Sequence, residues 1–256
     1  FTQEEIFIML HAFSRSEGLL GTEGLRTLAN ATVAVFGIGG VGSYVVEALA
    51  RAGVGNLILV DNDTVSITNL NRQLVALRST IGKKKVQVAK ERIMDINEDA
   101  VVHTYDTFFG LETAGLFDFA SYDYIVDAVD TVSAKILLIE KAKEFQIPII
   151  SCMGTGNKLD PSCFQITDIS KTSVCPLAKV MRTELKKRKI KKVKVLFSTE
   201  ISPGEKRKRL GIKEETVELE EKRAATGRPV PGSVSFVPGA AGLMIAGQVV
   251  RDLVNL

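Results

Sequence analysis

The feature that most constrains the fold of this chain is a glycine-rich turn between an apolar strand and a helix. The stretch Val33-Ala-Val-Phe-Gly-Ile-Gly-Gly-Val-Gly-Ser43 reads as a strand that runs into a G-x-G-x-x-G turn, with Gly37, Gly39 and Gly42 at the glycine positions. A second apolar strand ends at Asp61, 19 residues after Gly42. In such an arrangement the backbone approaches a nucleotide phosphate at a helix N-terminus, while the carboxylate binds the ribose hydroxyls. The turn therefore predicts a nucleotide site.

Strand-like and helix-like segments alternate from Ala31 to Ile150. Alternation of this kind is typical of an α/β fold, so we expect a Rossmann-like, doubly wound and mostly parallel sheet. The expected strands lie near 32–36, 57–61, 101–105, 123–128 and 147–151, and the expected helices near 42–53, 83–97 and 131–145.

The pattern changes after Cys152, where we expect an additional C-terminal α+β portion. Its expected elements are strands at 164–167 and 193–197, a helix at 176–189, a long surface loop at 202–235 and a closing helix at 239–254. The small residues of the closing helix suit close packing against another element, with a second subunit as one option. We divide the chain into an N-terminal helical segment (1–30), a nucleotide-binding core (31–160) and a C-terminal portion (161–256).

The net charge of +3 conceals a strongly basic segment at 179–209. This segment holds 13 Lys or Arg residues against Glu184, Glu200 and Glu205, a local balance of +10 that leaves about −7 for the remainder. A solvated helix end is one explanation, but clustered cations also neutralise the phosphates of polyanions. Because Phe197 is the only aromatic residue in the segment, contact with a folded RNA backbone is favoured over base stacking.

Several classes of protein are disfavoured. No apolar run is long enough to span a bilayer, and the N-terminus lacks the basic and apolar regions of a signal peptide, so we expect no membrane partner. Cys152, Cys163 and Cys175 show no C-x-x-C spacing, which argues against a zinc site and for a reducing, cytoplasmic compartment.

Four polar residues downstream of the turn are candidates for phosphate chemistry. Attack at a phosphate develops charge on its oxygens, so cations and a metal must surround it. Asn69, Arg72 and Lys85 are the candidates for phosphate contact, and Asp130, at a predicted strand end, is the candidate Mg²⁺ ligand. Each has a structural alternative: Asp130 as a helix cap, Lys85 in a solvated first turn, and Arg72 in a surface ion pair.

Taken together, five motifs in order resemble the E1-like adenylating enzymes, which include the molybdopterin-synthase adenylyltransferases and the ubiquitin-activating enzymes. The motifs are Gly37-Ile-Gly-Gly-Val-Gly-Ser43, Asp61-Asn-Asp63, Asn69-Leu-Asn-Arg-Gln73, Gly82-Lys-Lys-Lys-Val86 and Asp127-Ala-Val-Asp130. The resemblance implies that 31–160 is an ATP-binding adenylation core.

The resemblance also implies a role for each matching residue. Asp61 would bind the ribose, Asp130 would coordinate Mg²⁺, and an arginine of the N-terminal segment would reach the ATP of a partner subunit. Arg15 is our candidate for that arginine, with Arg26 second. The catalytic set is then Arg15, Asn69, Arg72, Lys85 and Asp130, and the ATP-binding set Gly37, Gly39, Gly40, Gly42, Asp61, Asp63, Asn69, Arg72 and Lys85.

Segments in the second half look like the tRNA threonylcarbamoyladenosine dehydratase branch. They are Asp160-Pro161, Asp168-Ile-Ser-Lys-Thr172 and Pro176-Leu-Ala-Lys-Val-Met-Arg182, although Cys175 stands before Pro176 where the branch has Asp. The resemblance implies ATP- and Mg²⁺-dependent cyclisation of a modified adenosine in tRNA by a homodimer, and it leaves open a sulfur-transfer protein partner.

Two other functions stay open. An activator of a sulfur-carrier or ubiquitin-like protein would adenylate a C-terminal Gly-Gly and would use Cys175 as a thioester nucleophile. An NAD-binding oxidoreductase would explain the glycines and Asp61, but it leaves Arg72 and Lys85 without a role. Its catalytic histidine would have to be His11 or His103.

Overall fold

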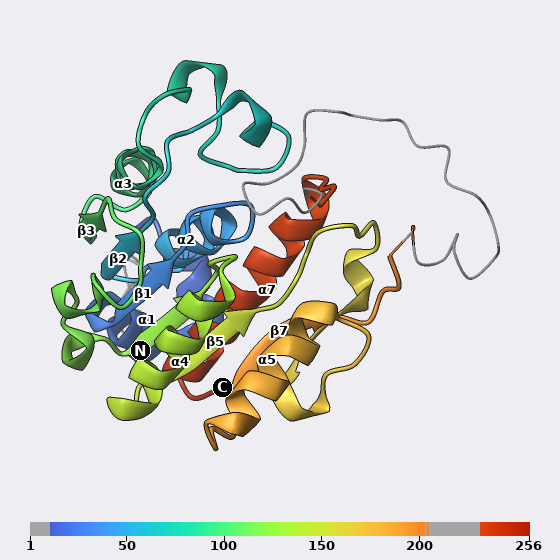
Figure 1. Ribbon diagram of the computed structural model, residues 1–256. Helices are drawn as coiled ribbons and strands as arrows, with labels where there is room; N and C mark the ends of the chain where they lie inside the picture. The colour runs from blue at the N-terminus through green and yellow to red at the C-terminus, as the bar shows by residue number, and fades with distance from the viewer. Residues whose placement is uncertain (1–10, 203, 205–230) are drawn as a thin grey trace, which may run out of the picture.

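The structure is a computed structural model that describes residues 11–202, 204 and 231–256. Its main feature is a seven-stranded sheet covered by helices on both faces (Figure 1). The elements are α1 (Ser14–Asn30), β1 (Thr32–Phe36), α2 (Gly42–Arg51), β2 (Asn56–Val60), α3 (Lys85–Ile96), β3 (Val101–Tyr105), β4 (Tyr124–Asp127), α4 (Val132–Glu144), β5 (Ile149–Cys152), β6 (Phe164–Asp168), α5 (Pro176–Lys187), β7 (Lys194–Ser198) and α7 (Phe236–Leu253). The α/β, Rossmann-like fold class is confirmed.

The strand order β3-β2-β1-β4-β5-β7-β6 makes the sheet doubly wound. Every neighbouring pair is parallel except β6 and β7, which are antiparallel. The chain leaves β1 toward β2 and β3, and leaves β4 toward β5 and β7. The switch point therefore lies between β1 and β4, where open α/β sheets bind their ligands at the carboxyl ends of the strands.

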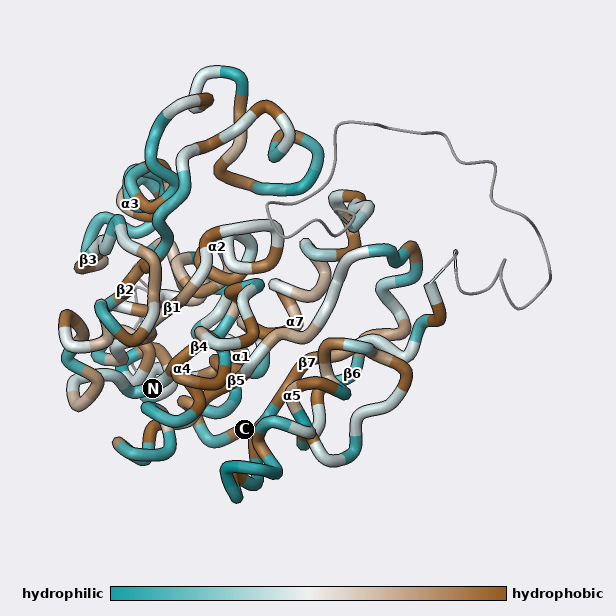
Figure 2. The backbone as a smooth tube through the Cα atoms, in the orientation of Figure 1, coloured by the Kyte–Doolittle hydropathy of each residue, from teal (hydrophilic) through white to brown (hydrophobic). Residues whose placement is uncertain are grey.

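Alternate residues of the central strands enter two separate hydrophobic cores, because successive side chains of a strand point to opposite faces. Val33 and Val35 pack with α2, α3 and α7, while Ala34 and Phe36 pack with α4 and α5. Burial on both faces explains why these strands read as continuous apolar runs. Figure 2 shows this concentration of hydrophobic residues in the strands.

The small residues of α7 serve packing within the chain. A Cβ on Gly242 would lie 2.5 Å from the carbonyl oxygen of Val41 and 2.7 Å from the Cβ of Tyr44, both at the start of α2. The helix begins at Phe236, earlier than the expected 239, because Pro238 fits the first turn of a helix, where no backbone donor is needed.

The other predicted elements differ from the observed ones by a few residues at their ends. The N-terminal helix is interrupted at Gly21, whose φ of 70° is not helical. Most of the expected loop at 202–235 and the last part of the basic segment lie outside the described residues. Within the described part of the chain, no helix combines the length and hydropathy needed to cross a membrane.

Candidate active site

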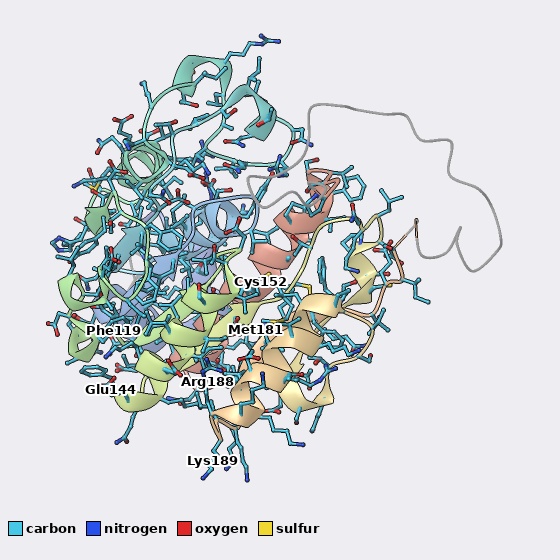
Figure 3. All side chains as sticks on the ribbon, viewed as in Figure 1. Phe119, Glu144, Cys152, Met181, Arg188 and Lys189 are labelled. Atoms are coloured by element: carbon cyan, nitrogen blue, oxygen red, sulfur yellow. The ribbon has the colours of Figure 1, made fainter. Side chains whose placement is uncertain are left out.

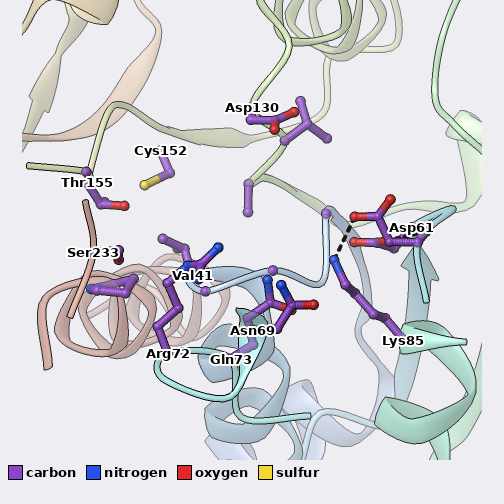
Figure 4. Close-up of a pocket in the computed structure, with 18 of the residues that line it drawn as sticks. Val41, Asp61, Asn69, Arg72, Gln73, Lys85, Asp130, Cys152, Thr155 and Ser233 are labelled. Atoms are coloured by element: carbon purple, nitrogen blue, oxygen red, sulfur yellow. Dashed lines mark hydrogen bonds and ion pairs between the residues drawn. The ribbon is translucent and has the colours of Figure 1, made fainter. Parts of the chain in front are cut away.

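A cavity of about 460 Å³ opens at the switch point, where β1, β2, β4 and β5 end (Figure 4). The carboxyl edge brings together residues that are far apart in the chain, as parallel strands require. The sequence-predicted residues that line it are Gly37, Gly39, Gly40, Asp61, Asp63, Asn69, Arg72, Lys85 and Asp130.

The glycine turn is shaped by close backbone contacts. Gly37 has a φ of 90°, and its N–H donates to the carbonyl of Val60 at 2.8 Å. A Cβ on Gly37 would lie 2.6 Å from the carbonyl oxygen of Ala128, and one on Gly42 would lie 1.7 Å from the carbonyl oxygen of Gly37. Only glycine fits both positions, and Gly39 and Gly40 between them line the cavity.

The turn leads into α2 without a side-chain cap, although the Ser43 and Tyr44 N–H groups donate to the carbonyls of Gly39 and Val41 at 3.0 and 3.1 Å. Val41 is the N-cap residue, and no side chain hydrogen-bonds to the amides of the first turn. The Ser43 hydroxyl is occupied elsewhere, because it accepts from the Leu74 N–H at 3.1 Å. A helix N-terminus without a side-chain cap is suited to bind an anion such as phosphate.

Asp61 ties the two strand ends together. One carboxylate oxygen accepts from the Ile38 N–H at 2.6 Å, and the other accepts from the Asp63 N–H at 2.8 Å. Burial raises the pKa of the Asp61 carboxyl above its ordinary value, and the positive charge of Lys85 opposes part of that rise. Hydroxyl donors on a ligand would stabilise the charged form further, which suits a ribose-binding carboxylate.

Asn69 ends a short 3₁₀ turn (Ile67–Asn69) that is capped by the Ser66 and Asn69 side chains, and Arg72 follows three residues later. The Asn69 carbonyl oxygen accepts from the Ser66 N–H at 3.0 Å, which leaves the amide nitrogen available to a ligand. Arg72 donates to the carbonyl of Thr68 at 2.8 Å and to Asn71 at 3.0 Å, and forms no ion pair with a described carboxylate. Its charge is therefore available for phosphate, contrary to the surface ion-pair alternative.

Lys85 is only 4% exposed, although Lys83 and Lys84 beside it are exposed. Its ammonium donates to Asp63 at 2.7 Å (dashed in Figure 4). The alternative of a solvated first turn is therefore wrong for Lys85. The burial places one cation at the cavity wall, next to the Asp61 and Asp63 carboxylates.

Asp130 is an exposed carboxylate at the rim of the cavity, three residues beyond the end of β4. Its carboxylate accepts from the neighbouring Thr131 hydroxyl at 3.2 Å, and it makes no side-chain cap to α4. In the described ranges, no group of three or more His, Cys, Asp or Glu residues could hold a metal by itself. One carboxylate beside a phosphate site fits Mg²⁺, which usually takes one or two carboxylates plus substrate phosphates.

A buried ion pair lies beneath Asp130. Lys135 and Asp127 are 1% and 0% exposed, and their charged atoms are 3.1 Å apart. The Lys135 ammonium also donates to the carbonyl of Cys152 at 2.7 Å, and Ser151 donates to Asp127. Asp127 accepts from the Val129 N–H at 3.2 Å, so the pair joins the ends of β4 and β5 to the turn that carries Asp130.

Sequence reasoning gave no role to Gln73. This side chain lines the cavity and is 8% exposed, and its amide oxygen is the one buried side-chain polar atom without a partner in the described chain. A buried acceptor without a donor is costly, so a hydroxyl or amino group of a ligand can satisfy it. Its place in the Asn69–Gln73 motif was the available signal.

Arg15 does not line the cavity. It is exposed on α1 and pairs with no carboxylate that the structure describes, whereas Arg26 forms an exposed ion pair with Glu23 at 2.9 Å. A role for Arg15 in the cavity of its own chain is therefore not supported, and its expected role at a partner subunit stays a prediction.

The cysteines are free thiols that lack the setting of a nucleophile. Cys175 is 3% exposed and packs in the core of the α4 and α5 face. Burial raises the pKa of the Cys152 thiol to about 12, which keeps it protonated. A thioester role for Cys175 would need this side chain to become accessible.

Comparison with known proteins identifies the family to which the chain belongs. The ThiF family model matches residues 13–256. The tRNA threonylcarbamoyladenosine dehydratase of Bacillus subtilis is 50% identical over 251 residues, which cover 96% of both chains. The Escherichia coli protein of the same name is 40% identical over 174 residues, which cover 68% of this chain and 65% of that protein.

Solved structures agree. The crystal structure of E. coli tRNA N6-threonylcarbamoyladenosine dehydratase in complex with ATP superposes with a TM-score of 0.81 at 32% identity, and covers 95% of this chain and 94% of that one. The chain therefore belongs to the ThiF family and, within it, to the family of the tRNA threonylcarbamoyladenosine dehydratases.

Proposed function

We propose that this protein uses ATP to dehydrate N6-threonylcarbamoyladenosine in tRNA, with release of AMP and pyrophosphate. The observation that carries the proposal is the switch-point cavity, which combines a glycine turn at a helix N-terminus without a side-chain cap, the unpaired cation Arg72 and the rim carboxylate Asp130. An NAD-binding oxidoreductase would need the glycines and Asp61 but would leave Arg72 and Asp130 without a role.

The first step is transfer of an adenylyl group. A carboxylate oxygen of the threonyl group attacks the α-phosphorus of ATP, and the bond to pyrophosphate breaks. The backbone amides of the glycine turn before α2 and the Arg72 guanidinium stabilise the charge that develops on the phosphoryl oxygens. Asp61 and the unpartnered Gln73 hold the nucleoside end. When bound by Asp130, Mg²⁺ would neutralise further phosphate charge.

The second step closes a ring within the substrate. The ureido group of the modified base attacks the activated carbonyl carbon, AMP leaves with the carboxyl oxygen, and a proton is released. Because nucleophile and electrophile belong to one molecule, the protein supplies mainly orientation and exclusion of water. This chemistry needs no nucleophile from the protein, which agrees with the burial of Cys175.

The test combines purified protein, ATP, Mg²⁺ and tRNA that carries threonylcarbamoyladenosine. After digestion, mass spectrometry is expected to show a nucleoside lighter by one water, with AMP formed in equal amount. Unmodified tRNA is the control and is expected to yield neither product. If the modified nucleoside keeps its mass while a Gly-Gly-tailed carrier protein supports pyrophosphate exchange, the proposal is replaced by the carrier-activating alternative.

We further propose that the active form is a homodimer in which Arg15 reaches the ATP of the partner. Support comes from the exposed face of α1, where Arg15 and the 86% exposed Leu19 are one turn apart and share a side. A subunit that covered Leu19 would also meet Arg15. We also propose that the protein acts in the cytoplasm, since its three free thiols suit a reducing compartment, and that a sulfur-transfer protein is a partner.

Mixing two inactive variants tests the trans role of Arg15. R15A and D130N are each expected to be inactive, but a hybrid dimer contains one intact site, built from Asp130 of the first chain and Arg15 of the second. After subunit exchange, random pairing is expected to restore about a quarter of the unaltered activity. Mixing R72A with D130N is the matched control and should restore nothing if Arg72 acts within its own chain. No recovery in the Arg15 mixture would contradict the proposal.

A further inference from the structure

A second cavity, of about 690 Å³, lies at the far end of α5 from the active site. Its apolar floor includes Leu185 and Ile190. We call it the basic cavity, because five cations line it against one carboxylate, Asp168. The cations are Arg182, Lys186, Lys189, Lys191 and Lys192.

The cations of this region fall into two groups. Lys187 and Arg188 do not line the cavity, and both pair with Glu184, at 2.7 and 2.8 Å; Arg188 also reaches Glu140 of α4 at 3.1 Å. The four lysines that line the cavity pair with no carboxylate among the described residues, while Arg182 donates to the carbonyl of Thr172 at 2.8 Å. In Figure 3, Lys189 projects away from the body of the protein, whereas Arg188 lies nearer to it. The unpaired charge is therefore concentrated at the cavity.

The Asp168 carboxylate does not neutralise this charge through an ion pair. It accepts from the Ser170 N–H at 2.8 Å as the cap of a 3₁₀ turn (Ile169–Lys171). Burial acts to raise the pKa of Asp168, but hydrogen bonds from Ser170 and Val193 and the charge of Lys171 together hold this pKa below its usual range. The carboxylate thus has a structural partner within its own turn.

In the loop after α5, lysine occupies two positions whose backbone conformation favours glycine. Lys189 and Lys192 have φ values of 58° and 57°, in the left-handed region. Lys189 follows the C-cap Arg188, and Ile190 closes the turn by donating to the carbonyl of Leu185 at 3.0 Å. Glycine is the usual residue at this position of a helix end. Lysine there places a charge at the cavity at the cost of backbone strain.

The separation of the two cavities suits a single strand of nucleic acid. Leu177, in the first turn of α5, lines the active site, and Lys186, nine residues later, lines the basic cavity. At 1.5 Å per residue the two ends are about 14 Å apart along the helix. A stacked strand covers that distance in about four nucleotides.

We propose that the basic cavity binds backbone phosphates of the tRNA substrate, a few nucleotides from the modified base held in the active site. This proposal rests on the proposed function for the identity of the RNA. The unpaired lysines replace counterions on the phosphates, and the apolar floor limits the water that screens them.

The test compares two variants that differ in which cations they lose. K189Q/K191Q/K192Q removes three unpaired lysines, and K187Q/R188Q removes the two paired cations beside them. The triple variant is expected to bind threonylcarbamoyladenosine-bearing tRNA at least about tenfold more weakly, with the slope of log Kd against log salt reduced by about 2 to 3. The control variant should keep both the affinity and the slope of the unaltered protein. Equal losses in both variants would show a diffuse field and overturn the proposal, as would an unchanged triple variant.

Kinetics separate this proposal from the proposed function. For tRNA, the triple variant should have a raised KM and an unchanged kcat; for the free modified nucleoside, which lacks neighbouring phosphates, it should match the unaltered protein. If the unaltered protein binds tRNA but never removes water, the proposed function fails while the binding comparison still tests the cavity. If it removes water and the triple variant has an unchanged KM, the cavity proposal alone fails.

A single substitution, K189G, checks that lost binding is not lost folding. Glycine relieves the left-handed strain while it removes one charge. We expect a Tm raised by about 1–3 °C together with weaker tRNA binding and a salt slope lower by about 1. A more stable protein with unchanged tRNA affinity would overturn a role for Lys189.

Discussion

Replacement of Lys135 by Met is expected to lower the free energy of unfolding by about 3–5 kcal/mol, because it leaves a buried carboxylate without its cation. Asp127 is fully buried and would retain only the Ser151 hydroxyl and the Val129 N–H. Met has a similar length, so the loss measures charge more than volume. Urea unfolding should show a lower midpoint with an unchanged m-value.

The double variant D127N/K135M is the matched control for this effect. It removes both charges, so no buried ion is left unpaired, and at least half of the lost stability should return. The exposed pair Lys141–Glu144, 2.8 Å apart, gives the contrasting case: K141M should change stability by less than about 1 kcal/mol. If K135M lost as little free energy of unfolding as K141M, the Lys135–Asp127 pair could not be shielded from water as its burial implies.

The fold could be predicted in large part from the sequence, because the hydrophobic pattern of each segment agrees with the place that the segment takes in the sheet. The strands at Thr32–Phe36 and Asn56–Val60 are apolar throughout, since each is covered on both faces. The glycine turn sits between a strand and a helix where steric contacts exclude any Cβ. The residues of each segment thus indicate whether it is a strand or a helix, and the observed ends differ from the predicted ones by only a few residues.

The candidate site was predictable where a residue's role depends on its position at a strand end, as for Asp61 and Asp130. It was less predictable where the role depends on long-range partners. Lys135 reads as one polar residue of a helix, and only the pairing of β4 with β5 brings it against Asp127 and the carbonyl of Cys152. Lys85 differs from Lys84 in the sequence only by its place in the Gly82–Val86 motif, and its burial beside Asp63 appears only in the structure.

The same distinction applies to the charge of the basic segment. A count of Lys and Arg predicts a polyanion-facing region, but it treats Lys187 and Lys189 alike. The structure separates them, since Glu184 pairs with Lys187 and with Arg188 but with none of the lysines that line the basic cavity. Unpaired charge at a cavity, and not total charge, is therefore the feature to test for RNA contact.

Substitution of Asp130 by Asn is expected to reduce kcat/KM for the ATP-dependent reaction by about 10²–10³-fold, since it removes the one rim carboxylate proposed to bind Mg²⁺. The effect should lie in catalysis and not in folding. Asp130 is exposed, and its side-chain hydrogen bond among the described residues is to the neighbouring Thr131, so stability should change by less than about 0.5 kcal/mol.

The dependence on Mg²⁺ concentration identifies what Asp130 does. If the carboxylate holds the metal, D130N should need a higher Mg²⁺ concentration for half-maximal pyrophosphate release, and D130E should recover part of the activity. D99N removes an exposed carboxylate next to β3 at the opposite edge of the sheet, and it should match the unaltered protein. If D130N loses activity as expected but its residual activity keeps an unchanged Mg²⁺ requirement, Asp130 contacts the substrate and not the metal, because loss of a metal ligand must weaken Mg²⁺ binding.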